Sequence, residues 1–150
     1  MSINVGDSAP DFSLPGKNGK PVHLKAILKE KPVVLYFYPK DDTPGCTKEA
    51  CSFRDAYQEF QEAGAAVIGV SADSVESHQK FSQNHQLPFE LLSDRNNQVR
   101  KLYGVPATFG LLPGRVTYVI DQSGTVRHLF NSQLNIKGHI ENALTVLKSL

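Results

Sequence analysis

The chain has 150 residues, of which 40% are hydrophobic and 21% are charged, and its formal net charge is +1. A charge so close to zero gives no electrostatic reason to expect a nucleic-acid or anionic membrane partner, and no apolar run approaches the roughly 20 residues that span a bilayer. Length and composition predict a single domain over residues 1–150, with a core that needs no disulfide.

The first half of the chain alternates between strand and helix patterns. Residues 11–24 predict an N-terminal β-hairpin that turns at Lys17-Asn18-Gly19. The apolar run at 32–38 predicts a strand covered on both faces, with its aromatic residues in the core. The segment 47–63 repeats its apolar residues at helical spacing and predicts a helix. The expected apolar stripe of this helix consists of Ala50, Phe53, Tyr57, Phe60 and Gly64.

The second half continues this alternation. The predicted elements are a strand at 65–71, a helix at 75–86, a strand at 89–94, a helix at 96–104 that ends at Gly104, and a hairpin with strands at 115–121 and 125–130. A last helix has an apolar face made of Ile136, Ile140, Ala143, Leu144 and Leu147. This order predicts an α/β fold with a central, mixed sheet flanked by helices.

The loop at 39–45 leaves the carboxyl end of the first buried strand, where sheets of this kind place their active sites. Thr43 is expected to cap the following helix and Pro44 to occupy its first position, so Cys46 falls in the first turn. Free backbone N–H groups and the helix dipole favour an anion there, and the thiolate is the nucleophilic form of cysteine.

The acidic pair Asp41-Asp42 opposes a nearby anion, so a cation is expected close to Cys46. Helical position alone does not choose among the candidates, which are Lys40, Lys48, Arg54 and Arg115.

The second cysteine, Cys51, lies five residues after Cys46. On an intact helix it sits about 140° around the axis and about 7.5 Å along it, which separates the two Cα atoms by about 8.7 Å. A disulfide requires about 4.4–6.8 Å between Cα atoms. Either the two cysteines never pair, or pairing unwinds the first turns of the helix. A third interpretation treats both cysteines as inert core residues.

The segment YPKDDTPGCTKEACSFRD at 38–55 resembles the active-site segment of the peroxiredoxins, specifically the peroxiredoxin Q or bacterioferritin comigratory protein group. The family pattern Pro-x-x-x-Thr-x-x-Cys is met by Pro39, Thr43 and Cys46, and Cys51 is the mark of the subgroup. The segments GDSAPDFSLP, LLSD and LPGRVTYVID, which contains Arg115, match the family in the usual order. The resemblance therefore covers essentially the whole chain and implies a thioredoxin-like fold of the peroxiredoxin type.

The resemblance also implies a thiol-dependent peroxidase for hydrogen peroxide and organic hydroperoxides. Cys46 is expected to attack the peroxide and become a sulfenic acid, which Cys51 resolves as an intramolecular disulfide. Thr43 is expected to hold the peroxide, Arg115 to stabilise the developing charge, and Pro39 to shape and shield the pocket.

Glu49 is expected to orient an arginine. The five histidines lack the spacing of metal ligands, so structural or surface roles are expected, without a metal or cofactor.

Thioredoxin or a related dithiol protein is the expected reductant, and a resolving thiol in the same chain suggests a monomer. The N-terminal residues lack the pattern of a secretory signal, which favours a bacterial-type cytoplasm. An organelle interior stays open, because a cleaved transit peptide would leave no trace. Two alternative functions are a thiol–disulfide oxidoreductase, although the usual C-x-x-C is missing, and a peroxide-sensing redox switch.

Overall fold

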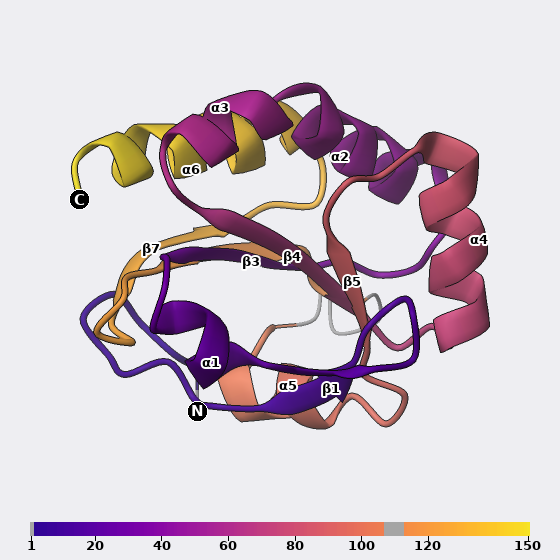
Figure 1. Cartoon of the computed structure of the whole chain (residues 1–150), viewed down its shortest axis with the longest axis horizontal. Helices are drawn as coiled ribbons and strands as arrows, with labels where there is room; N and C mark the ends of the chain where they lie inside the picture. Colours follow the sequence, from indigo (N-terminus) through magenta and orange to yellow (C-terminus); the bar gives the residue numbers. More distant parts are fainter. Residues whose placement is uncertain (1, 107–112) are drawn as a thin grey trace.

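A computed structural model describes residues 2–106 and 113–150 of the chain. Its centre is a five-stranded sheet with the strand order β5-β4-β3-β6-β7 (Figure 1). Strands β3, β4 and β5 run parallel, and β6 and β7 are antiparallel to their neighbours, so the sheet is mixed as predicted. The strand bounds are β3 Val33–Phe37, β4 Ala66–Ser71, β5 Glu90–Ser93, β6 Val116–Ile120 and β7 Val126–Asn131.

Strand β3 is central because both of its faces are apolar, as its sequence predicts. Side chains alternate along a strand, so Val34, Tyr36 and Tyr38 enter one hydrophobic cluster. Val33, Leu35 and Phe37 enter the other. The prediction that the aromatic residues of this run belong to the core is confirmed, since all three are at most 1% exposed.

The helices divide between the two faces of the sheet (Figure 1). One face carries α2 Pro44–Asp55, α3 Tyr57–Glu62, α4 Val75–His85 and α6 Ile136–Lys148. The other carries α1 Leu24–Leu28, α5 Gln98–Tyr103 and the hairpin of β1 Ser13–Pro15 and β2 Pro21–His23. No helix in the described ranges is long and apolar enough to cross a membrane.

Most predicted elements are confirmed within a few residues, including both hairpins, the end of α5 at Gly104 and the buried face of α6. The prediction that Pro44 occupies the first position of its helix is confirmed, but the continuous helix predicted through residue 63 is wrong, because it is broken at Ala56 into α2 and α3. The break removes few backbone hydrogen bonds, because the Ala56 carbonyl accepts bonds from two following N–H groups.

Two further differences concern short-range features. Gly64 does not belong to the buried stripe: it is exposed and has φ +76°, a conformation that suits glycine at a helix end. The five-residue helix α1 was not predicted, because so short a segment carries no clear helical period.

Candidate active site

Cys46 lies in the first turn of α2, just beyond the carboxyl end of β3, where the sequence predicts it. Its side chain is only 1% exposed and its thiol is free. The Nη2 atom of Arg115 donates a hydrogen bond to Sγ over 3.4 Å. The sulfur therefore lies at a helix N-terminus and beside a fixed positive charge, two features that stabilise a thiolate.

Arg115 is the cation that helical position alone could not choose and that the family resemblance implied. It is 4% exposed, and its Nη1 atom donates to Glu49 Oε1 over 2.6 Å while Nε donates to the Gln133 carbonyl over 3.1 Å. Burial lowers the pKa of Arg115, but the charges of Glu49 and Cys46 outweigh burial and raise it. The guanidinium is thus charged and held in one orientation by three acceptors.

The other cations proposed for Cys46 point elsewhere. Lys40 and Lys48 are exposed. Arg54 donates to the His85 carbonyl over 2.7 Å and pairs with its neighbour Asp55.

Gly45 makes the approach of Arg115 to Cys46 sterically feasible. A Cβ atom at this position would lie 3.0 Å from Arg115 Nη2. That distance is tighter than ordinary van der Waals contact, so a larger residue would displace the guanidinium. The sequence suggested Gly45 only as part of a helix start, and its role in accommodating Arg115 emerges from a contact 70 residues away.

Glu49 contacts Arg115 as predicted, one turn after Cys46 on the same side of α2. The carboxyl group is completely buried. Burial raises its pKa to about 7, although the charge and hydrogen bond of Arg115 act in the opposite direction.

Thr43 and Pro39 lie in the loop that precedes α2, and both are half-buried. Thr43 occupies the N-cap position, but the expectation that its side chain caps the helix is wrong. Its hydroxyl instead donates to the Lys40 carbonyl over 2.9 Å. This bond leaves the hydroxyl oxygen free to accept a hydrogen bond, and it tightens the loop that starts at Pro39.

Cys51 is half-exposed and free, and it lies in the same continuous helix as Cys46. An intact helix separates the two Cα atoms by about 8.7 Å, beyond disulfide range. The structure therefore corresponds to the dithiol form and keeps the two thiols apart.

A second buried arginine, Arg100, was missed in the sequence. It donates to the carbonyls of Tyr38 and Gly114, each over 2.8 Å, and its charge also interacts with Cys46. The segment 96–104 was predicted only as a helix. No sequence signal linked it to a loop about 60 residues earlier.

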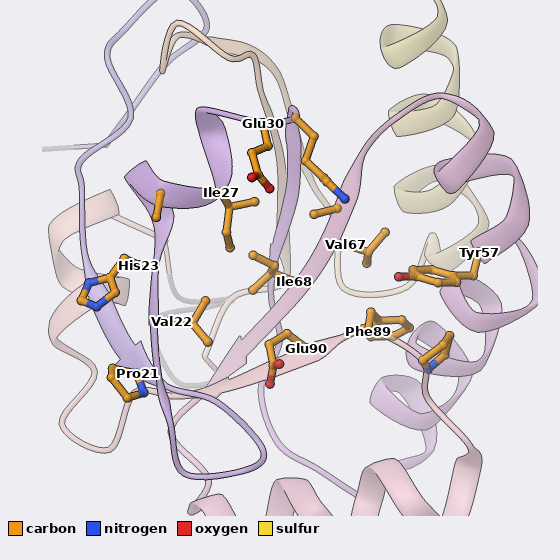
Figure 2. A pocket seen from close by; sticks show the side chains of 14 residues that line it. Pro21, Val22, His23, Ile27, Glu30, Tyr57, Val67, Ile68, Phe89 and Glu90 are labelled. Atoms are coloured by element: carbon orange, nitrogen blue, oxygen red, sulfur yellow. The ribbon is translucent and has the colours of Figure 1, made fainter.

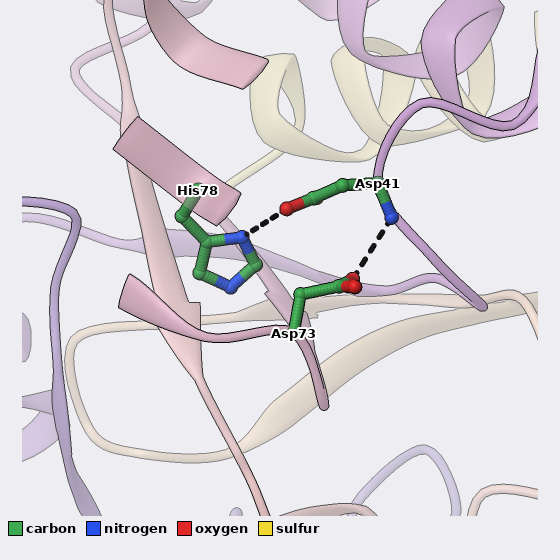
Figure 3. Close-up of side chains that lie close together, drawn as sticks. All are labelled: Asp41, Asp73 and His78. Carbon is green, nitrogen blue, oxygen red and sulfur yellow. Dashed lines mark hydrogen bonds and ion pairs between the residues drawn. The ribbon is translucent and has the colours of Figure 1, made fainter. Parts of the chain in front are cut away.

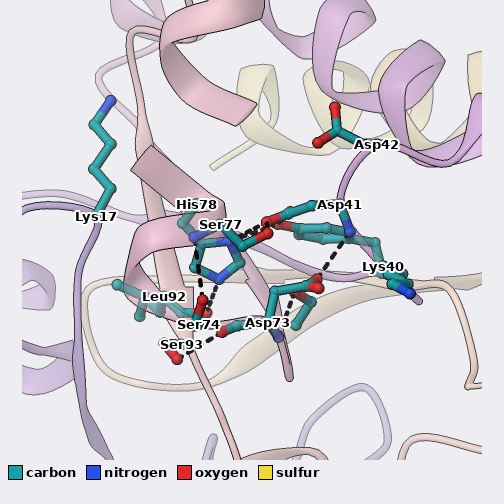
Figure 4. A network of polar contacts seen from close by, with 12 residues as sticks. Lys17, Lys40, Asp41, Asp42, Asp73, Ser74, Ser77, His78, Leu92 and Ser93 are labelled. Atoms are coloured by element: carbon teal, nitrogen blue, oxygen red, sulfur yellow. Dashed lines mark hydrogen bonds and ion pairs between the residues drawn. The ribbon is translucent and has the colours of Figure 1, made fainter. Parts of the chain in front are cut away.

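The loop before Cys46 is held by a buried polar network around Asp41 (Figure 4). Tyr38 donates its hydroxyl to Asp41 Oδ1 over 2.6 Å, and Ser77 donates to Oδ2 over 2.8 Å. His78 Nδ1 lies 2.8 Å from the same Oδ2, and its Nε2 donates to the Leu92 carbonyl over 2.9 Å. The Asp41 carboxylate thus ties the loop to α4 and β5.

Asp41, Asp73 and His78 form a group of side chains whose ligand-type atoms lie within 4.8 Å of one another (Figure 3). Asp73 accepts bonds from the Asp41 N–H over 2.8 Å and from the Ser71 hydroxyl over 2.6 Å. Both Asp41 oxygens and both His78 ring nitrogens are already hydrogen-bonded to protein groups. The geometry therefore describes a structural network, in keeping with the structural role expected for His78.

A groove of about 650 Å³ lies away from Cys46, at the amino end of β4, with Val22 and Ile27 on one side and Tyr57 and Phe89 on the other (Figure 2). Because Cys46 follows the carboxyl end of the parallel strand β3, the groove and the thiol lie at opposite ends of these strands.

The chain is similar to known proteins over most of its length. The sequence profile of the AhpC/TSA family matches residues 5–129. The chain is 52% identical over 149 residues to "Peroxiredoxin Q, chloroplastic" of Sedum lineare, which covers 99% of this chain and 80% of that protein.

Solved structures with the same architecture include two bacterial proteins. One is the peroxidoxin BcpB of Mycobacterium tuberculosis, with TM-score 0.90, 40% identity and 97% of each chain covered. The other is the bacterioferritin comigratory protein of Xanthomonas campestris, studied for alkyl peroxide reduction, with TM-score 0.82, 33% identity and 92% and 90% coverage.

Proposed function

We infer the roles of individual residues from the premise that the chain belongs to the AhpC/TSA family, in its peroxiredoxin Q group, and has the thioredoxin-like fold of these proteins. The protein is a thiol-dependent peroxidase that reduces hydroperoxides. One observation supports the assignment of its centre most strongly: the buried Cys46 thiol, in the first turn of α2, accepts a hydrogen bond from Arg115.

In the proposed first step the Cys46 thiolate attacks one peroxide oxygen. An S–O bond forms and the O–O bond breaks, so the sulfur is oxidised by two electrons and the peroxide is reduced. The departing hydroxide or alkoxide takes up a proton to become water or an alcohol. The product at Cys46 is a sulfenic acid.

Three neighbours are proposed to support this step. Arg115 stabilises the thiolate and the charge that moves onto the departing oxygen, because its guanidinium is fixed by Glu49 and Gln133. The Thr43 hydroxyl accepts a hydrogen bond from the peroxide and holds it near the sulfur. Pro39, which has no N–H, shapes the loop beside Cys46 and limits the access of water.

Cys51 is proposed as the resolving thiol. It attacks the sulfenic sulfur, forms an intramolecular disulfide and releases water. Because an intact helix keeps the Cα atoms about 8.7 Å apart, this step requires the first turns of α2 to unwind. The cost in helix hydrogen bonds and packing makes the oxidised segment the more open one and exposes the disulfide to a reductant.

A thioredoxin-type dithiol protein is the proposed reductant. We propose that the protein works as a single-domain monomer, since both thiols belong to one helix, and that it resides in a reducing compartment. A bacterial-type cytoplasm is one such compartment. An organelle interior is the other, in keeping with the chloroplastic relative.

The test mixes the reduced protein with one equivalent of hydrogen peroxide and follows thiol loss in a rapid-mixing instrument. Thiols should disappear far faster than those of a free cysteine, and one intramolecular disulfide should form. Cys46→Ser should abolish the reaction. Cys51→Ser should leave the first oxidation intact and block the disulfide.

The outcome that contradicts these assignments is equally specific. If both serine variants retain peroxide turnover with a thioredoxin-type reductant, neither cysteine has the proposed role.

A further inference from the structure

Arg115 contacts two acidic groups at once. Its Nη2 atom contacts Cys46 Sγ and its Nη1 atom contacts Glu49 Oε1. The second buried arginine, Arg100, interacts with Asp94 more strongly than with Cys46, and it donates hydrogen bonds to the carbonyls of Tyr38 and Gly114. One positive charge therefore faces two groups that could each carry a negative charge, in a place where water is largely excluded.

The second oxygen of Glu49 is unusual. Oε2 is buried and has no hydrogen-bond partner among the described residues. On the side of α6 it faces His139, whose Nδ1 lies 3.8 Å away. An ionised carboxylate with one bare, buried oxygen is costly, whereas a carboxyl group protonated on Oε2 is neutral and keeps the partial negative charge of its carbonyl oxygen toward Arg115.

His139 cannot supply the missing charge. Its Nε2 lies 2.7 Å from the Ser132 carbonyl, which only accepts, so Nε2 carries a hydrogen. Burial lowers the pKa of His139 to about 4, so the ring is neutral near pH 7. Its Nδ1 therefore accepts from the Thr117 hydroxyl over 2.7 Å. This bond uses the one lone pair of Nδ1, so the 3.8 Å approach to Glu49 Oε2 is neither a hydrogen bond nor an ion pair.

Tyr36 of β3 is the other titratable group that interacts with Glu49. It is completely buried, and its hydroxyl has no partner among the described residues. Burial and the charge of Glu49 raise the pKa of Tyr36, so this side chain is neutral and supplies no positive charge to Glu49. Burial also raises the pKa of Glu49 to about 7, and Arg115 is the group that acts in the opposite direction.

We propose that Glu49 is a positioning residue that keeps a proton on Oε2 while Cys46 is a thiolate and releases that proton when Cys46 is oxidised. This inference rests on the proposed role of Cys46 as the attacking thiolate. Arg115 then always faces one net negative charge, first on the sulfur and afterwards on Glu49, and it stays in one orientation through the step.

Protons balance when the sulfenic acid forms. The thiolate attacks the peroxide, the S–O bond forms and the O–O bond breaks. The departing hydroxide takes one proton from the solvent and becomes water. Glu49 releases one proton to the solvent, so the site exchanges no net proton when the sulfenic acid forms.

The proposal is tested by infrared difference spectroscopy at about pH 6, below the Glu49 pKa. Reduced protein carrying Cys51→Ser, which stops at the sulfenic acid, should show the C=O stretch of a protonated carboxyl. One equivalent of hydrogen peroxide should remove this band in step with thiol loss. Glu49→Gln should lack the band from the start, and Glu59→Gln, on an exposed position of α3, should keep it.

Thr117→Val identifies the band without altering Glu49, in case the glutamine variant does not fold. This change removes the hydroxyl that occupies His139 Nδ1, so Glu49 gains an acceptor and the band should shift or disappear. If neither substitution changes a carboxyl band, or if the band survives oxidation, the proposal is overturned. Thiol loss in the same samples reports the peroxidase reaction separately, because the reduced spectrum is recorded before peroxide is added.

The pH dependence of thiol oxidation by hydrogen peroxide gives a second readout that a purely structural role would not change. Above the Glu49 pKa a second negative charge competes for Arg115 in the unsubstituted protein. The rate constant of Glu49→Gln, divided by that of the unsubstituted protein, should therefore rise about fivefold between about pH 6 and about pH 8. A constant ratio would contradict the proposal.

Discussion

The chain before Cys46 and the chain after it are held in different ways. Before it, residues 38–43 are held through Asp41, whose two oxygens bond to the hydroxyls of Tyr38 and Ser77 and to His78 Nδ1. These bonds tie the loop to α4 and, through the bond from His78 to Leu92, to β5. After it, α2 is tied near Cys46 through Glu49, which has one oxygen on Arg115 and the other without a partner among the described residues, and at its far end through the bond from Arg54 to the His85 carbonyl. Both carboxylates are buried, but only the first is fully satisfied.

This difference separates a fixed part of the site from a movable one. A fully bonded buried network is rigid and costly to disturb. A helix that must unwind to bring Cys51 to Cys46 cannot be tied in the same way. The loop can thus hold Thr43 and Pro39 in place while the residues that follow change conformation.

Removing the cation that contacts both Cys46 and Glu49 should have the largest effect. Arg115→Gln takes the positive charge away from Cys46 and leaves Glu49 without its partner. The rate constant for thiol oxidation by hydrogen peroxide should fall about 100- to 1,000-fold, as for the loss of one preorganised donor. Rapid-mixing measurements of thiol loss provide the check, and a change of less than about threefold would remove Arg115 from the mechanism.

Asp41→Asn should damage the fixed part. The substitution removes the charge that organises Tyr38, Ser77 and His78 in the core. The free energy of unfolding should fall by about 3 kcal/mol in urea titrations. The neighbouring Asp42→Asn is the matched control, since this exposed residue should change stability by less than about 0.5 kcal/mol. Equal effects at both positions would show that the network does not fix the loop.

Glu49→Gln should change how stability depends on pH. The raised pKa of Glu49, about 7 against 4.5 for an ordinary glutamate, means that the folded state holds a proton that the unfolded state has lost between these values. Stability from this group is therefore present below about pH 4.5 and decreases as the pH rises through about 7. His139, with a pKa lowered from 6.5 to about 4, has the opposite slope, because there only the unfolded state binds the proton.

Without Glu49 the protein no longer loses this stability as the pH rises. Relative to the unsubstituted protein, the free energy of unfolding of Glu49→Gln should rise by up to about 1.4 kcal/mol per pH unit between about pH 4.5 and about pH 7. Urea titrations at several pH values measure the slope. A difference that does not grow with pH would mean that Glu49 titrates like an exposed glutamate.

Gly45→Ala should produce the smallest effect. The added Cβ would lie 3.0 Å from Arg115 Nη2 and push the guanidinium away from Cys46 by a few tenths of an ångström. Weakening one charge-assisted bond by about 1 kcal/mol slows peroxide reduction about fivefold. Stability should not fall, because alanine is the better helix former. An unchanged rate would show that the contact tolerates displacement.

Much of the order of strands and helices could be predicted because it follows from the local spacing of apolar residues. The alternation of Val33 to Tyr38 and the apolar face of α6 are examples. The first turn of α2 was also predictable, since Thr43-Pro44 marks a helix start. The direction of the Thr43 hydroxyl was not, because capping and a bond to Lys40 compete over similar distances.

The parts that escaped prediction depend on contacts between distant segments. Nothing local distinguishes Arg115 from Lys48 as the partner of Cys46, and the family resemblance was needed to choose it. Nothing local links Arg100 to the loop at Tyr38 or His78 to Asp41. These pairs are created by the strand order, which places β3 between β4 and β6.

Hydrogen exchange followed by mass spectrometry compares the two parts of the site directly. In the dithiol form, residues 38–43 and α2 should both be protected. In the disulfide form, amides in residues 44–55 should exchange much faster, while those of β3 and the loop around Asp41 keep their protection. Equal protection of α2 in both redox forms would contradict a fixed loop followed by a helix that unwinds.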